Sequence, residues 1–247
     1  MKSNKNQILQ QISSRKGQIA VLIDPDKSDS KDYLLEIIQK SKFANIDYFF
    51  VGGSTVTQSQ LQWVVNFLKQ NTIIPIVLFP GDGHQISNQA DAILYLSLLS
   101  GRNAEYLIGQ HVSSALEVYE LGIEVIPTAY ILIEGGNKSS VAYVSQTSPI
   151  PSDQIGIAIR TALAGTMQGK QVVFFDAGSG ALQSVPANFI NEFRKYSEHP
   201  IIVGGGISSK EKIQELQEAN VIVIGNKIEN DIDFLLDVAS FKQHIAS

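Results

Sequence analysis

Two glycine-rich segments near the C-terminal end of the sequence have the composition of phosphate-binding loops. Gly204-Gly205-Gly206 follows one apolar run, and Gly225-Asn226 follows the next. Three adjacent glycines would weaken the interior of a helix or strand, so they favour a turn whose backbone approaches a ligand closely. The amides at a helix N-terminus bind phosphate, and the first segment directly precedes helical sequence. Together the two segments predict a phosphate site.

Asp176 is the residue that we predict to act as a general base. It ends the run QVVFFD and precedes the small-residue segment Ala177-Gly178-Ser179-Gly180, whose amides can wrap a phosphorylated ligand. A carboxylate accepts a proton from a hydroxyl most readily where burial raises its basicity. The alternative for Asp176 is a capping role in the turn that follows it.

Asp24 and Ser54 are candidate ligands of Mg²⁺. Asp24 opens the segment DPDK, and Pro25 favours an extended conformation that directs the Asp24 carboxylate from the strand tip toward the axis of the fold. Mg²⁺ prefers one or two carboxylates together with substrate phosphates. Ser54 follows two glycines, and its hydroxyl can bind phosphate or complete a metal site. The alternatives are a turn with Asp26 or Ser28 as a cap, and a helix cap at Ser54.

Three other side chains carry weaker indications of function. His84 lies in a glycine-rich turn, Arg102 lies near a helix start, and Tyr130 lies within a long apolar run. A lone histidine in such a turn is more often structural than catalytic. Arg102 is equally consistent with anion binding and with a solvated position. Tyr130 can face the barrel interior or the pocket mouth, and core packing is its expected role.

Most of these residues follow short apolar runs, which we predict to be strands. The eight runs span residues 19–24, 46–51, 75–79, 91–96, 123–134, 171–176, 200–204 and 220–225. They are nearly continuously apolar, which is typical of parallel strands buried on both faces. The segments between them predict helices at 32–42, 59–70, 104–121, 153–168, 186–197, 209–217 and 231–245, and a short one at 85–89. This alternation predicts an α/β fold, a single (β/α)8 TIM barrel, whose active site lies at the carboxyl ends of the strands.

Two segments depart from the regular alternation. Residues 4–15 predict an extra N-terminal helix that covers one end of the barrel. The polar stretch 135–151 is too long for an ordinary connection, and such loops usually serve as lids or partner contacts. No shift in composition divides the chain, so we expect one domain over residues 1–247. An open doubly wound sheet is the second choice, but no G-x-G-x-x-G motif follows the first run.

Composition restricts the function classes. The net charge of −5 argues against nucleic-acid binding, because phosphate backbones select basic surfaces. No cysteine is present, so disulfides and cysteine zinc sites are excluded. The N-terminal segment lacks the apolar core of a signal peptide, and no apolar run is long enough to span a bilayer. We expect a cytoplasmic protein, and composition leaves open an amphipathic contact with a membrane surface.

Five motifs in order resemble the geranylgeranylglyceryl phosphate synthase family, which includes the bacterial heptaprenylglyceryl phosphate synthases. The motifs are DPDK, VGGST, SLLSGRN, FFDAGSGA and VGGGI…GN, and they extend over nearly the whole chain. The resemblance implies a Mg²⁺-dependent TIM-barrel prenyltransferase of ether phospholipid biosynthesis. Such an enzyme transfers a geranylgeranyl or similar group from an allylic prenyl diphosphate to the C3 hydroxyl of sn-glycerol 1-phosphate. The chain length and the segment 135–151 resemble the larger branch of the family, whose members are often oligomeric, so a dimer or hexamer is expected.

The resemblance also implies a set of site residues. Asp24 and Ser54 would bind the Mg²⁺ that holds the prenyl diphosphate, and Asp176 would orient or deprotonate the attacking hydroxyl. The substrate-binding residues that it implies are Phe174, Phe175, Asp176, Ala177, Gly178, Ser179, Gly180, Gly204, Gly205, Gly206, Gly225 and Asn226. The sequence departs from the family's commonest motif at Phe174, where a tyrosine is usual, and at Asp176, where glutamate is commoner. Ser100-Gly101 also replaces a frequent Asn-Ser.

Two other functions remain as alternatives. A phosphosugar isomerase on the same barrel would use paired acid and base groups, for which Asp24 and Asp176 are the available carboxylates. That function leaves the GGST and DPDK motifs unexplained. The second alternative is a non-catalytic phosphate-binding barrel, in which Phe174 and Asp176 mark lost activity.

Overall fold

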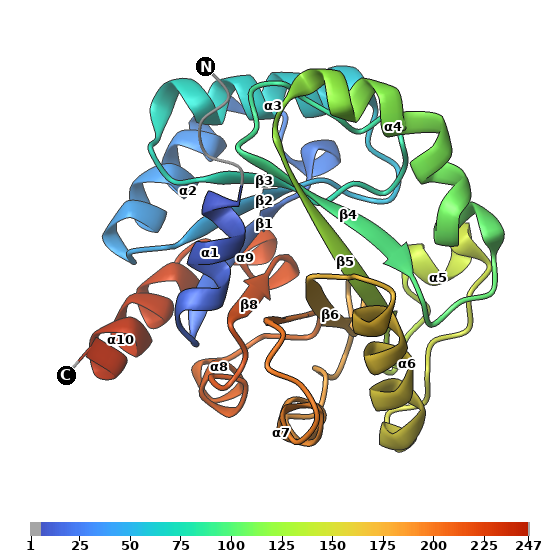
Figure 1. Ribbon diagram of the computed structural model, residues 1–247. Coiled ribbons are helices and arrows are strands. Elements are labelled where there is room, and N and C mark those ends of the chain that lie inside the picture. Colours follow the sequence, from blue (N-terminus) through green and yellow to red (C-terminus); the bar gives the residue numbers. More distant parts are fainter. Residues whose placement is uncertain (1–5, 247) are drawn as a thin grey trace.

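Eight parallel strands form a closed barrel in the computed structural model, which describes residues 6–246 (Figure 1). The strands are β1 (Gln18–Ile23), β2 (Tyr48–Val51), β3 (Ile76–Leu78), β4 (Ala92–Leu98), β5 (Glu124–Leu132), β6 (Val172–Asp176), β7 (Ile201–Gly204) and β8 (Val221–Ile224). Each strand pairs in parallel with the next, and β8 pairs with β1 to close the ring. The predicted (β/α)8 barrel is confirmed, and the open doubly wound sheet is excluded.

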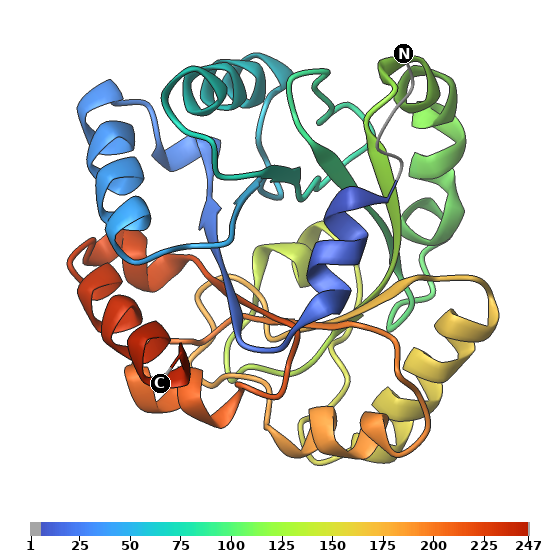
Figure 2. The ribbon, with the colours of Figure 1, turned by 60° about the vertical axis from the view of Figure 1, so that its left-hand side comes forward.

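Helices surround the barrel on its outer side (Figures 1 and 2). They are α2 (Lys31–Phe43), α3 (Gln58–Asn71), the π-helix η2 (Glu105–Gly109) continuing into α4 (Gln110–Leu121), α5 (Ser140–Ser145), α6 (Ile155–Met167), α7 (Asn188–Arg194), α8 (Lys210–Glu215), α9 (Asn226–Asn230) and α10 (Phe234–Ala246). A one-turn 3-10 helix, η1 (Pro25–Lys27), follows β1. Within the described part of the chain, no helix combines the length and the apolar character needed to cross a bilayer.

The helix predicted at residues 85–89 is wrong, because this segment consists of turns and irregular backbone. Its side chains and carbonyl groups bind the neighbouring connection instead of building a helix. The Gln85 amide donates to the carbonyl oxygen of Gly53 at 2.9 Å, and the Gln62 amide donates to the carbonyl oxygen of Ile86 at 2.9 Å. Polar side chains that satisfy backbone groups in this way compete with helix formation. The third connection is therefore hydrogen-bonded to the loop after β2 and to α3.

The polar stretch 135–151 contains structure that the sequence pattern does not indicate. It holds the short helix α5, which Ser139 caps by accepting from the amide of Ala142. A bridge between Ile133 and Ile150 closes the stretch on itself and attaches it to the end of β5. Its role as a lid or partner contact stays a prediction, as does the assignment of residues 1–247 to one prenyltransferase domain, part of which lies outside the described residues.

The nearly continuous apolar runs are explained by two separate cores. In β2, Tyr48 and Phe50 point into the barrel, while Phe49 and Val51 point outward to the layer between the strands and the helices. All four side chains are fully buried. A parallel strand covered on both faces leaves no position for an exposed polar side chain, so alternation disappears from its sequence.

Helix α1 (Gln7–Ser14) lies across the amino-terminal end of the barrel (Figure 2). The Glu124 carboxylate at the start of β5 accepts hydrogen bonds from the amides of Ile8 and Leu9, both at 2.8 Å. A carboxylate at this place satisfies the free amides of the first helical turn and favours the positive end of the helix dipole. The extra N-terminal helix is thereby confirmed, although residues 4 and 5 of the predicted range lie outside the described residues.

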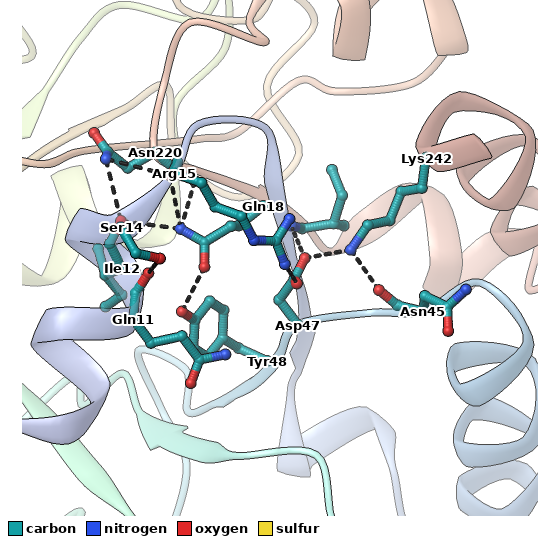
Figure 3. Close-up of polar contacts among 11 residues, drawn as sticks. Gln11, Ile12, Ser14, Arg15, Gln18, Asn45, Asp47, Tyr48, Asn220 and Lys242 are labelled. Carbon is teal, nitrogen blue, oxygen red and sulfur yellow. Dashed lines mark hydrogen bonds and ion pairs between the residues drawn. The ribbon is translucent and has the colours of Figure 1, made fainter. Parts of the chain in front are cut away.

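A polar network beside α1 completes this end of the barrel (Figure 3). The buried Asp47 carboxylate forms ion pairs with both Arg15 and Lys242, and these pairs connect the segment after α1 to α10. The Tyr48 hydroxyl donates to Gln18 at 2.7 Å inside the barrel. Polar groups at the amino-terminal face of these barrels contribute to stability, whereas active sites occupy the opposite face.

Candidate active site

A cavity of about 390 Å³ opens at the carboxyl ends of the strands and gathers most of the predicted site residues. The predicted residues that line it are Ser54, Phe174, Asp176, Gly178, Ser179, Gly180, Gly204, Gly205, Gly206, Gly225 and Asn226. Phe175 and Ala177 instead belong to the core between the barrel and its helices. The Phe175 ring packs edge-on against Phe189, with their centroids 6.0 Å apart. Side chains alternate along β6, so Phe174 and Asp176 face the cavity while Phe175 and Ala177 face the surrounding helices.

Both oxygens of the Asp176 carboxylate accept hydrogen bonds at the floor of this cavity. Oδ1 accepts from the amide of Gly178 at 2.9 Å, and Oδ2 accepts from the hydroxyl of Tyr130 at 2.5 Å. Burial raises the pKa of Asp176, and the two hydrogen bonds oppose that rise. The capping alternative is therefore present in the structure, because Asp176 organises the turn after it. The raised pKa nevertheless also gives the carboxylate the basicity that proton abstraction requires.

Tyr130 belongs to the buried core of the barrel, as expected, and it also lines the cavity, which was its alternative position. It pairs with Phe174 across β5 and β6, and the two rings meet edge-on with centroids 5.4 Å apart. Phe79, after β3, stacks on Phe174 at 5.3 Å, so Tyr130, the hydrogen-bond donor to Asp176, belongs to a cluster of three aromatic rings. The alternation within β5 is the signal that decides among the predicted positions of Tyr130, but it needs the correct strand register.

The turn after β7 can be built only with glycine. Gly205 and Gly206 have φ values of 80° and 67°, in the left-handed region that disfavours side chains. A Cβ on Gly205 would lie 2.7 Å from the amide nitrogen of Gly178, and a Cβ on Gly206 would lie 2.5 Å from the carbonyl of Gln183. The β7 turn therefore packs directly against the loop after β6. This close approach leaves backbone rather than side chains at the cavity wall.

Gly204 serves a different purpose at the end of β7. A Cβ at this position would lie 3.1 Å from the Phe174 ring and 3.3 Å from Oδ1 of Asp176. The missing side chain leaves room for the inward-facing residues of the neighbouring strand. Of the three adjacent glycines, one therefore makes space for Asp176 and two shape the turn.

Asn226 connects the loop after β6 to helix α9. Its side-chain oxygen accepts from the amide of Gly180 at 2.6 Å and from the hydroxyl of Ser179 at 3.2 Å. Its side-chain nitrogen donates to Glu229 at 2.9 Å. The sequence motif Gly225-Asn226 thus lies at the cavity, where the Asn226 side chain holds the Gly178–Gly180 turn in place.

Asp24 and Ser54 lie on adjacent strand ends. A Cβ on Gly53 would lie 2.9 Å from Oδ1 of Asp24, so the Asp24 carboxylate contacts the residue before Ser54. Asp24 also caps η1 by accepting from the amide of Asp26 at 3.1 Å, and burial raises its pKa. Neither Asp26 nor Ser28 caps the helix that follows, because Ser30 caps α2 and Asp24 itself caps η1. Thr57 caps α3 in place of Ser54.

The residues around Asp24 fit a Mg²⁺ ion whose other ligands come from a substrate and from water. The described residues contain no group of three or more histidine, cysteine, aspartate or glutamate side chains able to enclose a metal. A single carboxylate with a nearby hydroxyl is nevertheless the donor set that Mg²⁺ uses when phosphate oxygens and water supply the remaining ligands. The donor chemistry thus agrees with the predicted site at Asp24 and Ser54.

The cavity continues outside the barrel between β4 and α4. Its lining there includes Ile93 and Tyr95 of β4 and His111 and Ser114 of α4. The Tyr95 and His111 rings are in contact at 4.4 Å, and burial, with a smaller contribution from Lys170, lowers the pKa of His111. The imidazole is therefore neutral at physiological pH, and this part of the cavity is suited to an apolar group. The cavity lining also includes Ile86, from the connection where a helix was predicted at residues 85–89.

His84 and Arg102 are exposed and do not line the cavity. The Arg102 guanidinium donates to the carbonyl oxygens of Leu99 and Gly101 at 3.2 Å and 2.7 Å. Arg102 therefore stabilises the connection after β4, and the structure does not bring it to the other candidate residues.

The sequence model of the PcrB family matches residues 10–242. The chain belongs to the PcrB family. Curated relatives named geranylgeranylglyceryl phosphate synthase include one from Chitinophaga pinensis, 48% identical over 89% of this chain and 88% of its own. Another, from Zunongwangia profunda, is 47% identical over 86% of this chain and 91% of its own.

A solved structure extends the comparison to the PcrB fold. The (S)-3-O-geranylgeranylglyceryl phosphate synthase of Thermoplasma acidophilum, in complex with its substrate sn-glycerol-1-phosphate, superposes with a TM-score of 0.88. It is 29% identical in sequence and covers 97% of both chains. The family resemblance stated from five sequence motifs is confirmed.

Proposed function

We propose that this protein is a prenyltransferase that joins an allylic prenyl diphosphate to the C3 hydroxyl of sn-glycerol 1-phosphate and releases diphosphate. The single observation that carries the proposal is the position of Asp176. Its buried carboxylate lies between a glycine turn suited to phosphate and an apolar extension of the same cavity. The names of the PcrB relatives and the glycerol phosphate bound in the Thermoplasma acidophilum enzyme support it.

The acceptor half of the proposed site comprises the ends of β6, β7 and β8. The phosphate of glycerol 1-phosphate would bind the backbone at Gly205, Gly206 and Gly225, beside Asn226. These residues line the cavity together with Asp176. A ligand held by its phosphate at this edge reaches inward with its hydroxyl groups, which is the orientation that catalysis by approximation needs.

The donor half comprises the ends of β1 and β2. Asp24 and Ser54 would hold Mg²⁺ and, through it, the diphosphate. The chemistry supplied by a bound Mg²⁺ is neutralisation of the charge that develops on the departing diphosphate. The prenyl chain would lie in the apolar extension between β4 and α4, where Ile93 and Tyr95 line the wall.

The reaction exchanges one carbon–oxygen bond for another. The bond between the allylic carbon and the diphosphate oxygen breaks, and the glycerol hydroxyl oxygen forms the new ether bond to that carbon. Asp176 accepts the hydroxyl proton, for which burial has raised the basicity of its carboxylate. The stacked rings of Phe79 and Phe174 line the cavity and would help to exclude water from the reacting groups.

An assay with the purified protein tests the proposal. Radiolabelled sn-glycerol 1-phosphate is incubated with prenyl diphosphates of several lengths, with Mg²⁺ or with a chelator, and lipid-extractable label is counted. The expected result is Mg²⁺-dependent transfer in the wild type and its loss in Asp176→Asn. Binding of glycerol phosphate without transfer would support the non-catalytic alternative, and turnover of a phosphosugar without a prenyl donor would support the isomerase.

Further proposals concern the setting of the enzyme. We place the reaction in ether phospholipid synthesis and the protein in the cytoplasm, where a water-soluble acceptor and a membrane-bound product would meet at a lipid surface.

We also propose a homo-oligomer, a dimer or hexamer. Ile108, Val112 and Leu116 support self-association, because they form an exposed apolar stripe along η2 and α4. Light scattering of the wild type and of Leu116→Glu tests this assignment.

A further inference from the structure

We propose that Tyr130 is the positioning residue of Asp176, and that its hydroxyl holds one carboxylate oxygen so that the other lone pairs face the acceptor hydroxyl. This inference rests on the proposed function and adds a residue to it. The motifs that carry the family resemblance end before and begin after Tyr130, so none of them assigns it a role.

The hydrogen bonds of Asp176 fix the carboxylate in one orientation. The Tyr130 hydroxyl lies 2.5 Å from Oδ2, and the amide of Gly178 lies 2.9 Å from Oδ1. Rotation of the carboxylate would break both bonds. Each carboxylate oxygen has a second lone pair, so Asp176 can still accept a proton from a substrate while both bonds remain.

Core packing alone does not require a tyrosine at this position. The Tyr130 ring meets Phe79 and Phe174 edge-on, with centroids 5.8 Å and 5.4 Å apart, and a phenylalanine ring would make the same contacts. Tyr130 is only 5% exposed, so its hydroxyl needs a partner inside the protein. That partner is the Asp176 carboxylate. The hydroxyl therefore acts on the residue that we assign as the base.

The donor role of Tyr130 is stable across the working pH range. Burial and the neighbouring Asp176 charge raise the pKa of Tyr130 well above its ordinary value, so the phenol stays protonated. From β7 the residue facing Asp176 is Gly204, which brings no charge, and from the following loop it is the Gly178 amide. Tyr130 is thus the titratable group against Asp176, and its hydrogen bond lowers the pKa that burial raises.

The test compares the pH profiles of the wild type and Tyr130→Phe. We expect kcat to fall about tenfold, which is less than the roughly 10²–10⁴ that general-base catalysis contributes, because Asp176 itself remains. The KM for glycerol 1-phosphate should change little, since the phosphate contacts are intact. The acid limb of kcat/KM should move upward by about one pH unit, because the carboxylate loses a donor to its charged form.

Tyr48→Phe is the matched control. Tyr48 is also fully buried, and its hydroxyl donates to a single side chain, Gln18, at 2.7 Å at the opposite end of the barrel. Both variants lose one buried phenol hydrogen bond, so both should lower the melting temperature. Only Tyr130→Phe should shift the pH profile. Equal profiles in the wild type and Tyr130→Phe would overturn the positioning role.

A second variant keeps the test decisive if Tyr130→Phe does not fold. Site-specific replacement of Tyr130 by 3-fluorotyrosine retains the ring and the hydroxyl and makes the phenol a stronger donor. The acid limb should then move downward, opposite to the phenylalanine variant, and an unmoved limb overturns the proposal. Absence of prenyl transfer in the wild type would instead contradict the proposed function, so the two failures are distinguishable.

Discussion

Lys27 and Glu229 connect the two ends of the strand series across the mouth of the barrel. The Lys27 ammonium, in η1 after β1, lies 2.8 Å from Oε2 of Glu229 in α9, after β8. The same carboxylate oxygen accepts from Asn226, whose other amide atom accepts from Gly180. This chain of contacts links the segment that carries Asp24 to the turn that follows Asp176. A continuous series of polar contacts therefore connects the proposed donor half of the site to the acceptor half.

We predict that Glu229→Ala raises the KM for both substrates. Loss of the carboxylate frees Lys27 beside Asp24 and Asn226 beside the Gly178–Gly180 turn, so both halves lose order. Hydrogen bonds to charged groups contribute about 1.5–3 kcal/mol, and the lower end corresponds to roughly a tenfold rise in KM. Lys27 is nearly half exposed, which favours that lower end.

Glu215→Ala serves as the control for the Glu229 variant, because Glu215 pairs with Lys212 at 2.7 Å on the exposed surface of α8. Steady-state kinetics with each substrate varied in turn should show normal values for this control. A Glu229→Ala enzyme in which only one KM rises would contradict the coupling of the two halves.

The β7 turn yields a prediction with an internal control. Gly206→Ala should weaken glycerol 1-phosphate binding by more than about tenfold and lower stability, because the new Cβ would meet the Gln183 backbone at 2.5 Å. Gly169→Ala imposes a similar strain, with φ at 87°, but meets no atom within 4 Å. Calorimetric titration with glycerol 1-phosphate and thermal melts would separate the two. Equal affinity in both variants would show that the turn has no part in phosphate binding.

Asp24→Asn isolates the charge of the proposed metal ligand. Asparagine retains the oxygen that accepts from the Asp26 amide, so η1 should keep its cap. We predict a fall in Mg²⁺-dependent turnover of at least about 10², since the ion's charge stabilisation contributes several kcal/mol. The control is Asp29→Asn, an exposed carboxylate in the same connection. Turnover measured against Mg²⁺ concentration checks the prediction, and a normal curve for Asp24→Asn would remove Asp24 from the metal site.

The sequence predicts the barrel well because parallel strands covered on both faces have a distinctive composition. Eight such runs, separated by helical segments, suffice to indicate the closed sheet. The same pattern fails at residues 85–89, where Gln85 binds the neighbouring backbone. Helix α9 is too short for its periodicity to be seen.

The site is predicted less completely than the fold. Asp176 and the glycine turns are visible because they are local motifs at strand ends. The contact of Tyr130 with Asp176 and the contact of Glu229 with Lys27 are not visible, because the partners are 46 and 202 residues apart along the chain. Their roles depend on strand register and on the closure of β8 against β1, neither of which is encoded in a local pattern.

The ionised Asp176 carboxylate should reduce the stability of the folded protein. Burial raises the pKa of Asp176 above its ordinary value of 3.8, so the folded chain holds this proton more tightly than the unfolded chain does. The stabilisation from this group is complete below pH 3.8 and is lost as the pH rises through the folded pKa. At neutral pH the ionised carboxylate therefore opposes folding.

We accordingly predict that Asp176→Asn abolishes transfer while it raises the free energy of unfolding at pH 7.5, because the variant buries no charge. Urea unfolding of the variant and the wild type between pH 4 and 8 measures the difference, which should shrink toward the acid end as the wild-type carboxyl is protonated. Asp153→Asn, at an exposed position before α6, should leave the curve unchanged. A less stable Asp176→Asn protein at pH 7.5 would mean that the Tyr130 and Gly178 hydrogen bonds outweigh the burial of the charge.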